Sequence, residues 1–380
     1  MILKIKKNTG SFRNNLMIIF ILLAMMPASL SYSEDSPKKK IKYWNADISI
    51  SPYYDSNILK YSDKYIQRFM NREDEGRFHI NRYDDLVVQY SLGLTYSNTL
   101  IKKLKSEFSF DYSYNRYSFN NVKDWMRFSI GWMQYFLPKS SFMISYSYIP
   151  HFYVRHFRDE DWAAFYGFTP LTFQPYEFSK DDFSFWVQHY FFKSTRVRLY
   201  FSYYRYLLDP NNTEYDSNDF MYGIRVFQTI AKNLSVNAGY KYATSTAKGY
   251  DGPAETKETA DDVNADNYSH NYFAGISYNL PKILRMKNSV GIDVQYERTF
   301  YTTTNFYEID PIHAGRHDKN LDVTFNYNID LAGNTNVSAF YSFTARKTGT
   351  PAAVNAEYIS DEKSYDQYQA GMKIKYNLEF

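Results

Sequence analysis

Cysteine is absent from the 380 residues. The chain therefore forms no disulfide, binds no metal through thiolates and carries no lipid on a lipoprotein cysteine. No run of about 20 apolar residues is present, and the mean hydropathy is −0.54, which excludes a helical membrane span beyond the start of the chain. Strong charge of one sign is also absent: without residues 1–33, 40 Lys and Arg stand against 41 Asp and Glu. A nucleic-acid partner, which needs a basic surface, is therefore not expected.

The first 42 residues carry a targeting pattern. Four basic residues precede the 11-residue apolar run "LMIIFILLAMM" at 16–26, and the small-residue stretch "SLSYSEDS" follows it. This order predicts a secretory signal peptide over 1–33, cut after Ser33, followed by a short periplasmic segment over 34–42. An N-terminal membrane anchor is the alternative, but 11 residues are short for one.

Aromatic residues are abundant, with 40 Tyr and 30 Phe making 20% of the chain, which excludes disorder. A chain of this length is enough for two soluble domains or one large barrel. Apolar and polar residues alternate with a period of two, which predicts strands with one apolar face. The alternating runs lie within 44–51, 88–97, 107–115, 126–132, 142–148, 183–187, 197–203, 220–226, 234–242, 272–280, 290–296, 321–331, 337–345 and 368–380.

The connections between these fourteen predicted strands alternate between short and mostly long. The short ones are "NTLIKK", "LPKSS", "FKST", "IAKN", "PKILRMK" and "AGNT"; the others cover 55–83, 117–123, 155–180, 209–218, 248–267, 304–318 and 348–364. A transmembrane barrel sorts its loops in this way, and its strands need about 9–11 residues to span. We therefore predict an all-β fold over 43–380, a transmembrane antiparallel up-and-down barrel of 14 strands, with 12 or 16 as alternatives.

The chain ends in "KIKYNLEF", in which every second residue is apolar. This ending resembles the C-terminal signature of bacterial outer-membrane β-barrel proteins. The resemblance implies that the barrel-assembly machinery recognises Tyr376, Leu378 and Phe380, and that the mature protein lies in the outer membrane of a Gram-negative cell. It points to the architecture and to no single family within it.

Basic residues are expected on the lipid-facing side at the external ends of four strands. They are Arg116, Arg205, Arg298 and Lys347. Long basic side chains at this depth reach the headgroups, and Arg pairs with phosphate through two hydrogen bonds. We interpret the four as contacts to outer-membrane lipid and lipopolysaccharide; ordinary interfacial placement is the alternative.

The predicted lumen carries its charges unevenly. Basic residues fall on strands seven to nine, and acidic residues on strands eleven and twelve: Arg196, Arg198, Arg225 and Lys241 against Asp293, Glu297, Asp322 and Asp330. Such a separation would create a transverse field that orients charged or dipolar solutes. The alternative is a set of salt bridges that only hold the barrel round.

Aromatic residues also point into the predicted lumen, on strands six and seven: Trp186, Tyr190, Tyr200 and Tyr204. They could stack on sugar rings or guide apolar solutes, or they could fill space as interior packing. In the first long connection, "NILKYSDKYIQRFM" has apolar residues near helical spacing, which predicts a short amphipathic helix in or over the mouth.

Catalytic and cofactor-binding groups are not evident. His189 falls on the lipid face, five other His fall in or beside loops, and only His151 is expected to point inward near the external rim. Ser147 shares its strand but lies about 13 Å away, too far for a hydrogen bond. We therefore expect neither an enzyme, nor a metal site, nor a cofactor.

The pattern as a whole favours a porin-like channel for passive diffusion of small hydrophilic solutes, with a monomer as the expected state. A surface-interaction or structural barrel with a loop-blocked lumen is the first alternative. A hydrophobic-compound transporter or an outer-membrane lipid enzyme is the second. Fourteen-stranded fatty-acid-type transporters carry an N-terminal hatch, and residues 34–42 are too few to form one.

Overall fold

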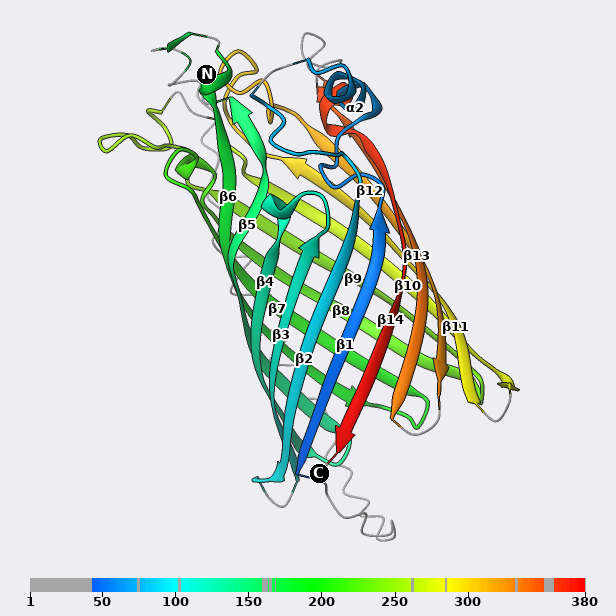
Figure 1. The fold of residues 1–380 in the computed structure, drawn as a ribbon. Coiled ribbons are helices and arrows are strands. Elements are labelled where there is room, and N and C mark those ends of the chain that lie inside the picture. Colours follow the sequence, from blue (N-terminus) through cyan, green and yellow to red (C-terminus); the bar gives the residue numbers. More distant parts are fainter. Residues whose placement is uncertain are drawn as a thin grey trace. The chain divides into compact units, whose positions relative to one another are not determined.

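The computed structural model describes residues 43–379 except 74–75, 102–103, 159–162, 164–165, 168, 261–262, 284–285, 332–333 and 352–358 (Figure 1). The predicted signal peptide, the segment 34–42 and Phe380 lie outside the described residues. No helix in the described part of the chain is long and apolar enough to cross a bilayer.

Fourteen strands make up the described fold, with the helix α2 (Asp63–Met70) in the first connection. Three short 3-10 helices lie in other connections: η1 (Asn121–Lys123), η2 (Pro170–Thr172) and η3 (Thr213–Tyr215). The strands are β1 (Trp44–Asp55), β2 (Asp85–Thr99), β3 (Lys105–Tyr117), β4 (Trp125–Leu137), β5 (Ser140–Arg158), β6 (Phe173–Tyr190), β7 (Thr195–Leu208), β8 (Ser217–Ala231), β9 (Leu234–Ala247), β10 (Asn267–Ile283), β11 (Met286–Tyr301), β12 (His317–Asp330), β13 (Thr335–Gly349) and β14 (Tyr365–Glu379).

The sheet closes on itself. Every strand pairs antiparallel with its sequence neighbours, and β1 pairs with β14, with Ile48 opposite Tyr376 and Ala46 opposite Leu378. Figure 1 shows blue β1 beside red β14. Closure gives the backbone groups of every strand partners within the sheet, which a lipid environment requires. The prediction of a 14-stranded transmembrane up-and-down barrel is confirmed, and the counts of 12 and 16 are excluded.

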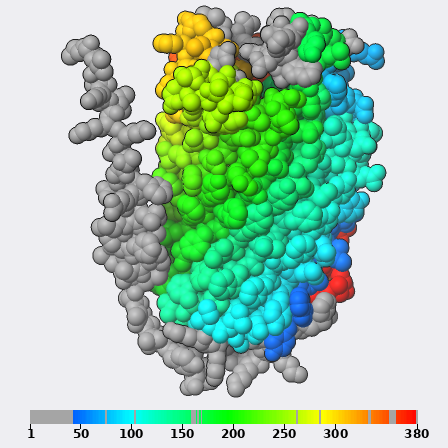
Figure 2. All heavy atoms as spheres, turned by 90° about the vertical axis from the view of Figure 1, so that its left-hand side faces the viewer, coloured from blue at the N-terminus to red at the C-terminus, as the bar shows by residue number. Residues whose placement is uncertain are grey.

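The apolar residues of the alternating pattern face outward. Ile48 is 53% exposed, Ile130 57% and Tyr376 47%, values that a soluble core would not leave at these positions. Aromatic pairs cross between neighbouring strands on this face, as at Tyr203 and Phe220, whose ring centroids lie 5.0 Å apart. Figure 2 shows part of this outer wall, from cyan to green, as a continuous surface. The barrel therefore presents hydrocarbon to its surroundings and polar groups to its lumen.

The connections are sorted by length, as the sequence predicts, and the long ones lie at one end of the barrel (Figure 1). The prediction of a loop over 155–180 is wrong at both ends. β5 continues to residue 158 and β6 begins at 173, so these strands are 19 and 18 residues long. They pair above the apolar belt, with Phe157 opposite Gln174, because the ladder continues to satisfy their backbone groups there.

The β1–β2 loop, residues 56–84, contains the predicted helix. Ser62 caps α2 by accepting a hydrogen bond from the Tyr65 backbone N–H, which satisfies one of the first helical donors. Ile58, Leu59, Tyr61 and Tyr65 are 2–6% exposed and form an apolar cluster. The loop reaches across the mouth, because the Arg155 guanidinium of β5 lies 4.3 Å from the Tyr61 ring centroid.

Candidate functional site

Three neighbouring strands form a basic wall inside the barrel, which we define as Arg196 and Arg198 of β7, Arg225 of β8 and Lys241 of β9. Their positions alternate with outward apolar residues such as Val197 and Ile224, so the pleat directs them inward. Arg198 stands directly opposite Arg225 in the ladder. Like charges placed directly opposite destabilise a sheet.

The two arginines of β7 contact neutral groups. The Arg198 guanidinium lies 4.1 Å from the Trp186 ring centroid, and its Nε and Nη2 donate to Gln188 Oε1 at 3.1 and 2.7 Å. The Arg196 guanidinium lies 4.0 Å from the Phe227 ring centroid. Aromatic faces and an amide orient these cations without cancelling their charge.

Arg225 and Lys241, the other two residues of the basic wall, also contact neutral groups. The Arg225 guanidinium lies 4.9 Å from the ring centroids of both Phe227 and Phe273, and it donates to Asn237 Oδ1 at 3.0 and 2.6 Å. The Lys241 ammonium lies 5.3 Å from the Phe273 centroid. The inward-facing phenyl rings therefore separate and hold the cations.

The acidic residues face the lumen from β11 and β12. Glu297 accepts from Asn271 Nδ2 at 2.9 Å, and Asp322 accepts from Thr344 Oγ1 at 2.5 Å. Asp330 accepts from Asn336 Nδ2 at 2.8 Å and is paired in the ladder with Lys287 at the short-turn end. We define the acidic wall as Asp293, Glu297 and Asp322, since Asp330 lies at the rim and apart from them.

The two walls share three cross-strand rows. Each row follows paired residues from β7 to β12, and each has a cation toward one end and a carboxylate toward the other. The rows are Arg196–Phe227–Asn237–Gly275–Asp293–Thr324, Arg198–Arg225–Gly239–Phe273–Gln295–Asp322, and Tyr200–Gly223–Lys241–Asn271–Glu297–Asn320. Neighbouring strands lie about 4.8 Å apart, so two strand spacings separate Lys241 from Glu297, and four separate Arg225 from Asp322.

The basic wall and the acidic wall meet at β10, where Gly275 has no side chain and leaves space for its neighbours. A Cβ at this position would lie 2.5 Å from Asp293 Oδ1 and 2.6 Å from Asn237 Nδ2. Both side chains therefore extend over the glycine, and Asn237 is also the hydrogen-bond acceptor of Arg225. The boundary between the walls thus depends on a residue without a side chain.

The sets of charges that the sequence singled out are not joined by salt bridges. Within the described ranges, neither the four bases nor Asp293, Glu297, Asp322 and Asp330 take part in an ion pair within 4.0 Å. Lumenal pairing occurs elsewhere, as between Lys375 Nζ and Asp47 Oδ2 at 3.3 Å. The arrangement can therefore keep a transverse charge separation in a wet lumen.

The four predicted lumenal aromatics lie beside cations. Trp186 contacts Arg198, and the Tyr190 hydroxyl accepts from Arg196 at 3.4 Å. Tyr200 lies 5.7 Å from the Lys241 ammonium, and Tyr204 lies 4.2 Å from that of Lys180. These contacts give the rings a role in positioning charge.

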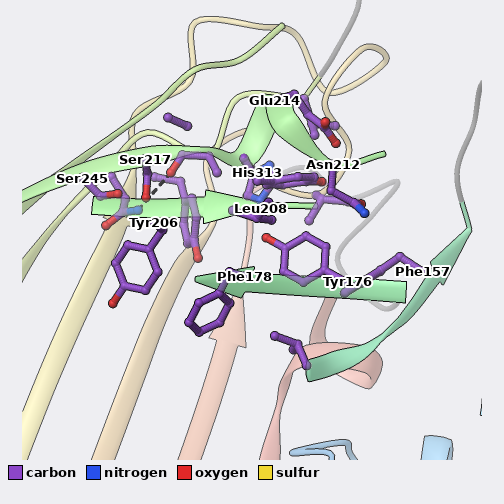
Figure 3. Close-up of a pocket in the computed structure, with 18 of the residues that line it drawn as sticks. Phe157, Tyr176, Phe178, Tyr206, Leu208, Asn212, Glu214, Ser217, Ser245 and His313 are labelled. Carbon is purple, nitrogen blue, oxygen red and sulfur yellow. Dashed lines mark hydrogen bonds between the residues drawn. The ribbon is translucent and has the colours of Figure 1, made fainter. Parts of the chain in front are cut away.

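A chamber of about 520 Å³ lies at the long-loop end of the lumen. Figure 3 shows Tyr176 and Phe178 of β6 and Tyr206 of β7 facing one space, with His313 above them in this view. The Phe178 and Tyr206 rings meet edge to face at 5.3 Å. One wall of the chamber is therefore aromatic.

Charged groups of the loops complete the chamber. The Arg316 guanidinium donates to both oxygens of Asp318 at 3.0 and 2.9 Å, and Arg346 pairs with the same carboxylate. Burial lowers the pKa of Lys363 to about 8. Nε and Nη1 of Arg155 are buried and have no hydrogen-bond partner among the described residues. The chamber is thus lined by cations of which Arg155 is the least compensated.

A buried His–Asp pair anchors the β11–β12 loop in this chamber. His313 Nδ1 lies 3.0 Å from Asp310 Oδ1, and both residues are buried. Burial lowers the pKa of His313 despite the carboxylate beside it. Burial alone would raise the pKa of Asp310, but hydrogen bonds from the His313 ring and from the backbone N–H groups of Asn264 and His313 outweigh it and lower that pKa.

The basic residues predicted for the lipid face differ in their surroundings. Arg116 is exposed on β3. Arg205 donates to Asp181 Oδ2 at 2.9 and 2.6 Å, and the Tyr146 hydroxyl donates to the same carboxylate. Arg298 and Lys347 lie in one cross-strand row with Lys319, a residue that the sequence analysis did not single out.

The histidine and serine positions do not form a catalytic arrangement around His151. His151 Nε2 lies 2.7 Å from Glu177 Oε2, whereas Ser147 bonds to Ser129 at 2.7 Å. His270 lies close to the β9–β10 loop, in the first residues of β10, opposite Arg298. In the ranges that the structure describes, no three metal-ligating side chains lie together.

Several lumenal residues escaped the sequence analysis. Phe227, Phe273, Gln188 and Asn237 lie at inward positions and hold the basic wall. Strict alternation of inward and outward positions could have identified the two phenylalanines as apolar residues on a polar face. Their contacts with arginine could not be found in this way, because they depend on the strand register.

Comparison with protein-family models and with curated protein sequences finds no match. Among solved structures, a bacterial polysaccharide outer membrane secretin is similar, with a TM-score of 0.45 at 6% identity over 88% of this chain and 98% of that chain. The outer membrane channel DcaP of Acinetobacter baumannii gives 0.44 at 11% identity over 88% and 96%. An anion-selective porin from Comamonas acidovorans gives 0.38 at 9% identity over 89% and 98%.

Proposed function

We propose that this protein is a porin-like channel of the bacterial outer membrane that passes small hydrophilic solutes by passive diffusion, one lumen to each monomer. The closed barrel and its apolar outer face support a membrane location. The polar inner face supports passage of water and solutes through the barrel. No step of this function requires a cofactor.

The three rows of separated charge carry the proposal. Charges that are buried without an opposite charge are costly, so a dry, plugged lumen would be expected to pair them or to replace them. Here the basic wall is held by rings and amides, and the acidic wall by amides and hydroxyls. Hydration supplies the remaining stabilisation, which favours a water-filled passage.

The solutes expected to pass are small and polar, and those with an anionic group interact most with the basic wall. A cavity of about 520 Å³ falls in the range that accommodates small organic molecules. The transverse field orients a solute with separated charges as it passes the rows.

Electrical recording tests the proposal. The purified mature barrel, inserted into a planar bilayer, is expected to give steady steps of ion current. Liposomes that contain the barrel are expected to swell in small neutral sugars and not in large polysaccharides. Electrically silent barrels that are shown to be folded and inserted would refute channel function.

One observation favours the second candidate, a surface-interaction barrel with a loop-blocked lumen. The β1–β2 loop has its own apolar cluster, and Tyr61 of that loop contacts Arg155 of β5. If this contact is permanent, the loops form a platform for a partner. Deleting residues 59–73 distinguishes the candidates, because a blocked barrel would conduct only after the deletion.

The assembly signal belongs to the same proposal. Tyr376 and Leu378 face outward on β14 beside Ile48 and Ala46, and Phe380 lies outside the described residues. We expect the barrel-assembly machinery to bind this edge before β1 pairs with it. Removal of Phe380 should slow membrane insertion in cells, measured as accumulation of unfolded protein in the periplasm.

A further inference from the structure

A row of basic side chains crosses the outer face of the barrel near its long-loop end. The ladder places His270 of β10 opposite Arg298 of β11, Arg298 opposite Lys319 of β12, and Lys319 opposite Lys347 of β13. Arg298, Lys319 and Lys347 are exposed. Directly opposite residues have Cβ atoms about 5 Å apart, so three full charges fall within about 10 Å.

The protein itself does not neutralise this row. In the described part of the chain, none of the three exposed cations forms an ion pair within 4.0 Å. The outward carboxylate on the adjacent strand is Asp366 of β14, which stands opposite Ala345 and not opposite Lys347. Arg205 gives the contrast, since it shares its outer face with Asp181 and pairs with it at 2.6 Å.

Such a row is unfavourable unless something outside the protein compensates it. Like charges directly opposite in a sheet repel each other, and their repulsion is least screened next to hydrocarbon. The sheet nevertheless keeps three basic residues in succession along this row. An anion that reaches all three strands at once would relieve this repulsion.

The residues beside the row indicate what kind of anion. One step toward the membrane centre, the outward positions of the same strands are Tyr296, Leu321 and Ala345, followed by Val294, Val323 and Phe343. The row thus lies where the apolar belt ends. A ligand that covers both surfaces has an anionic head above and hydrocarbon chains below.

The side chains of the row are partly oriented in advance. The Arg298 guanidinium lies 4.9 Å from the Phe300 ring centroid. The Tyr240 hydroxyl lies 2.7 Å from Nδ1 of His270, which fixes that ring at the edge of the row. An oriented guanidinium can bind phosphate with two parallel hydrogen bonds, and lysines add point charges.

We propose that Arg298, Lys319 and Lys347 form a site for the phosphorylated headgroup of lipopolysaccharide in the outer leaflet. Arg298 binds one phosphate through two hydrogen bonds, and Lys319 and Lys347 bind the second phosphate of the same headgroup, while the acyl chains lie on the aliphatic surface below. The site lies on the outer face, so it is independent of conduction through the lumen.

Native mass spectrometry of the full mature barrel in detergent tests this site, with bisphosphorylated lipid A as the probe. The wild type is expected to retain one lipid A, and the triple variant Arg298→Gln, Lys319→Gln, Lys347→Gln to bind at least tenfold more weakly. Lys282→Gln is the matched control, because it removes one exposed charge from β10 at the short-turn end of the barrel, away from the row. The affinity of this control variant for lipid A should stay within twofold of that of the wild type.

Two further measurements use only the wild-type protein, so they test the site even if the triple variant misfolds. Dephosphorylated lipid A should bind the wild type at least tenfold more weakly, and binding of lipid A should weaken with increasing salt. Equal binding of the dephosphorylated lipid, or an equal loss in Lys282→Gln, would overturn the site. So would full competition by inorganic phosphate at the concentration of the lipid, since the anion alone would then suffice.

Discussion

Arg225 offers the sharpest test of the charged lumen. It stands opposite Arg198 in the ladder, lies between two phenyl rings, and shares a cross-strand row with Asp322. Arg225→Gln removes one charge from the basic wall and keeps a polar side chain that can reach Asn237. The variant is therefore expected to fold and to change the selectivity of the channel for ions.

The size of the effect follows from the distance at which an anion passes. An anion about 4 Å from a guanidinium is stabilised by about 1 kcal/mol in bulk water and by about 4 kcal/mol at an effective dielectric constant of about 20. The phenyl rings exclude part of the water around Arg225, so the smaller value is a lower bound. Since 1.4 kcal/mol corresponds to tenfold, the anion-to-cation permeability ratio should fall at least about fivefold.

The measurement is the reversal potential of single channels under a tenfold gradient of KCl. The ionic strength should stay near 0.1 M, where charges act over about 10 Å, and the effect should shrink at 1 M, where they act over about 3 Å. Asp322→Asn is the mirror variant at the acidic end of the row and should raise the ratio. Arg116→Gln removes a charge from the outer face and should leave the ratio unchanged.

Two outcomes would refute this reasoning. An unchanged permeability ratio in Arg225→Gln at 0.1 M would mean that permeating ions do not approach the basic wall. A change of the same size at 0.1 M and 1 M would mean that the substitution altered the shape of the lumen and not its field. A folded wild type that conducts is the common reference for both.

Three further predictions follow from single sites. Gly239→Ala would place Cβ 2.5 Å from a backbone carbonyl oxygen of β8, so this variant should lower the free energy of unfolding by about 1–3 kcal/mol. At Gly275 only side chains lie that close, so Gly275→Ala should lower the free energy of unfolding by less. Urea midpoints compare the two variants, and equal midpoints would contradict this prediction. Asn57 Nδ2 donates to the backbone oxygens of Tyr61, in the β1–β2 loop, and of Asp366, in β14, at 2.8 and 3.0 Å. Asn57→Ala removes both hydrogen bonds, so protease should cut this loop faster. An unchanged cleavage rate would count against Asn57 as an anchor of the loop. Burial and the stacked His79 ring, 3.6 Å away, lower the pKa of His156 to about 4. His156 binds a proton more readily when the β1–β2 loop opens, so the contact between His79 and His156 should hold fully above about pH 6.5 and weaken as the pH falls toward 4. Proteolysis of this loop should therefore become faster at low pH in the wild type but not in His156→Asn.

Much of the architecture could be predicted because one physical rule governs it. The alternation at Ile374, Tyr376 and Leu378 repeats along the chain with a period of two, and only a closed sheet satisfies such strands in lipid. The strand count, the sorting of loops and the inward position of the basic residues follow from that rule. The length of β5 and β6 does not, because above the membrane the apolar pattern no longer applies.

Contacts between strands were beyond the sequence. That Arg198 stands opposite Arg225, that Arg205 is paired with Asp181, and that Lys319 joins Arg298 and Lys347 all depend on the register between strands, which turn geometry and loop length set. The sequence by itself determined which face of each strand meets lipid, because that choice is made residue by residue along the strand. The tertiary structure decided which charges become neighbours, because closure of the barrel sets the register between strands.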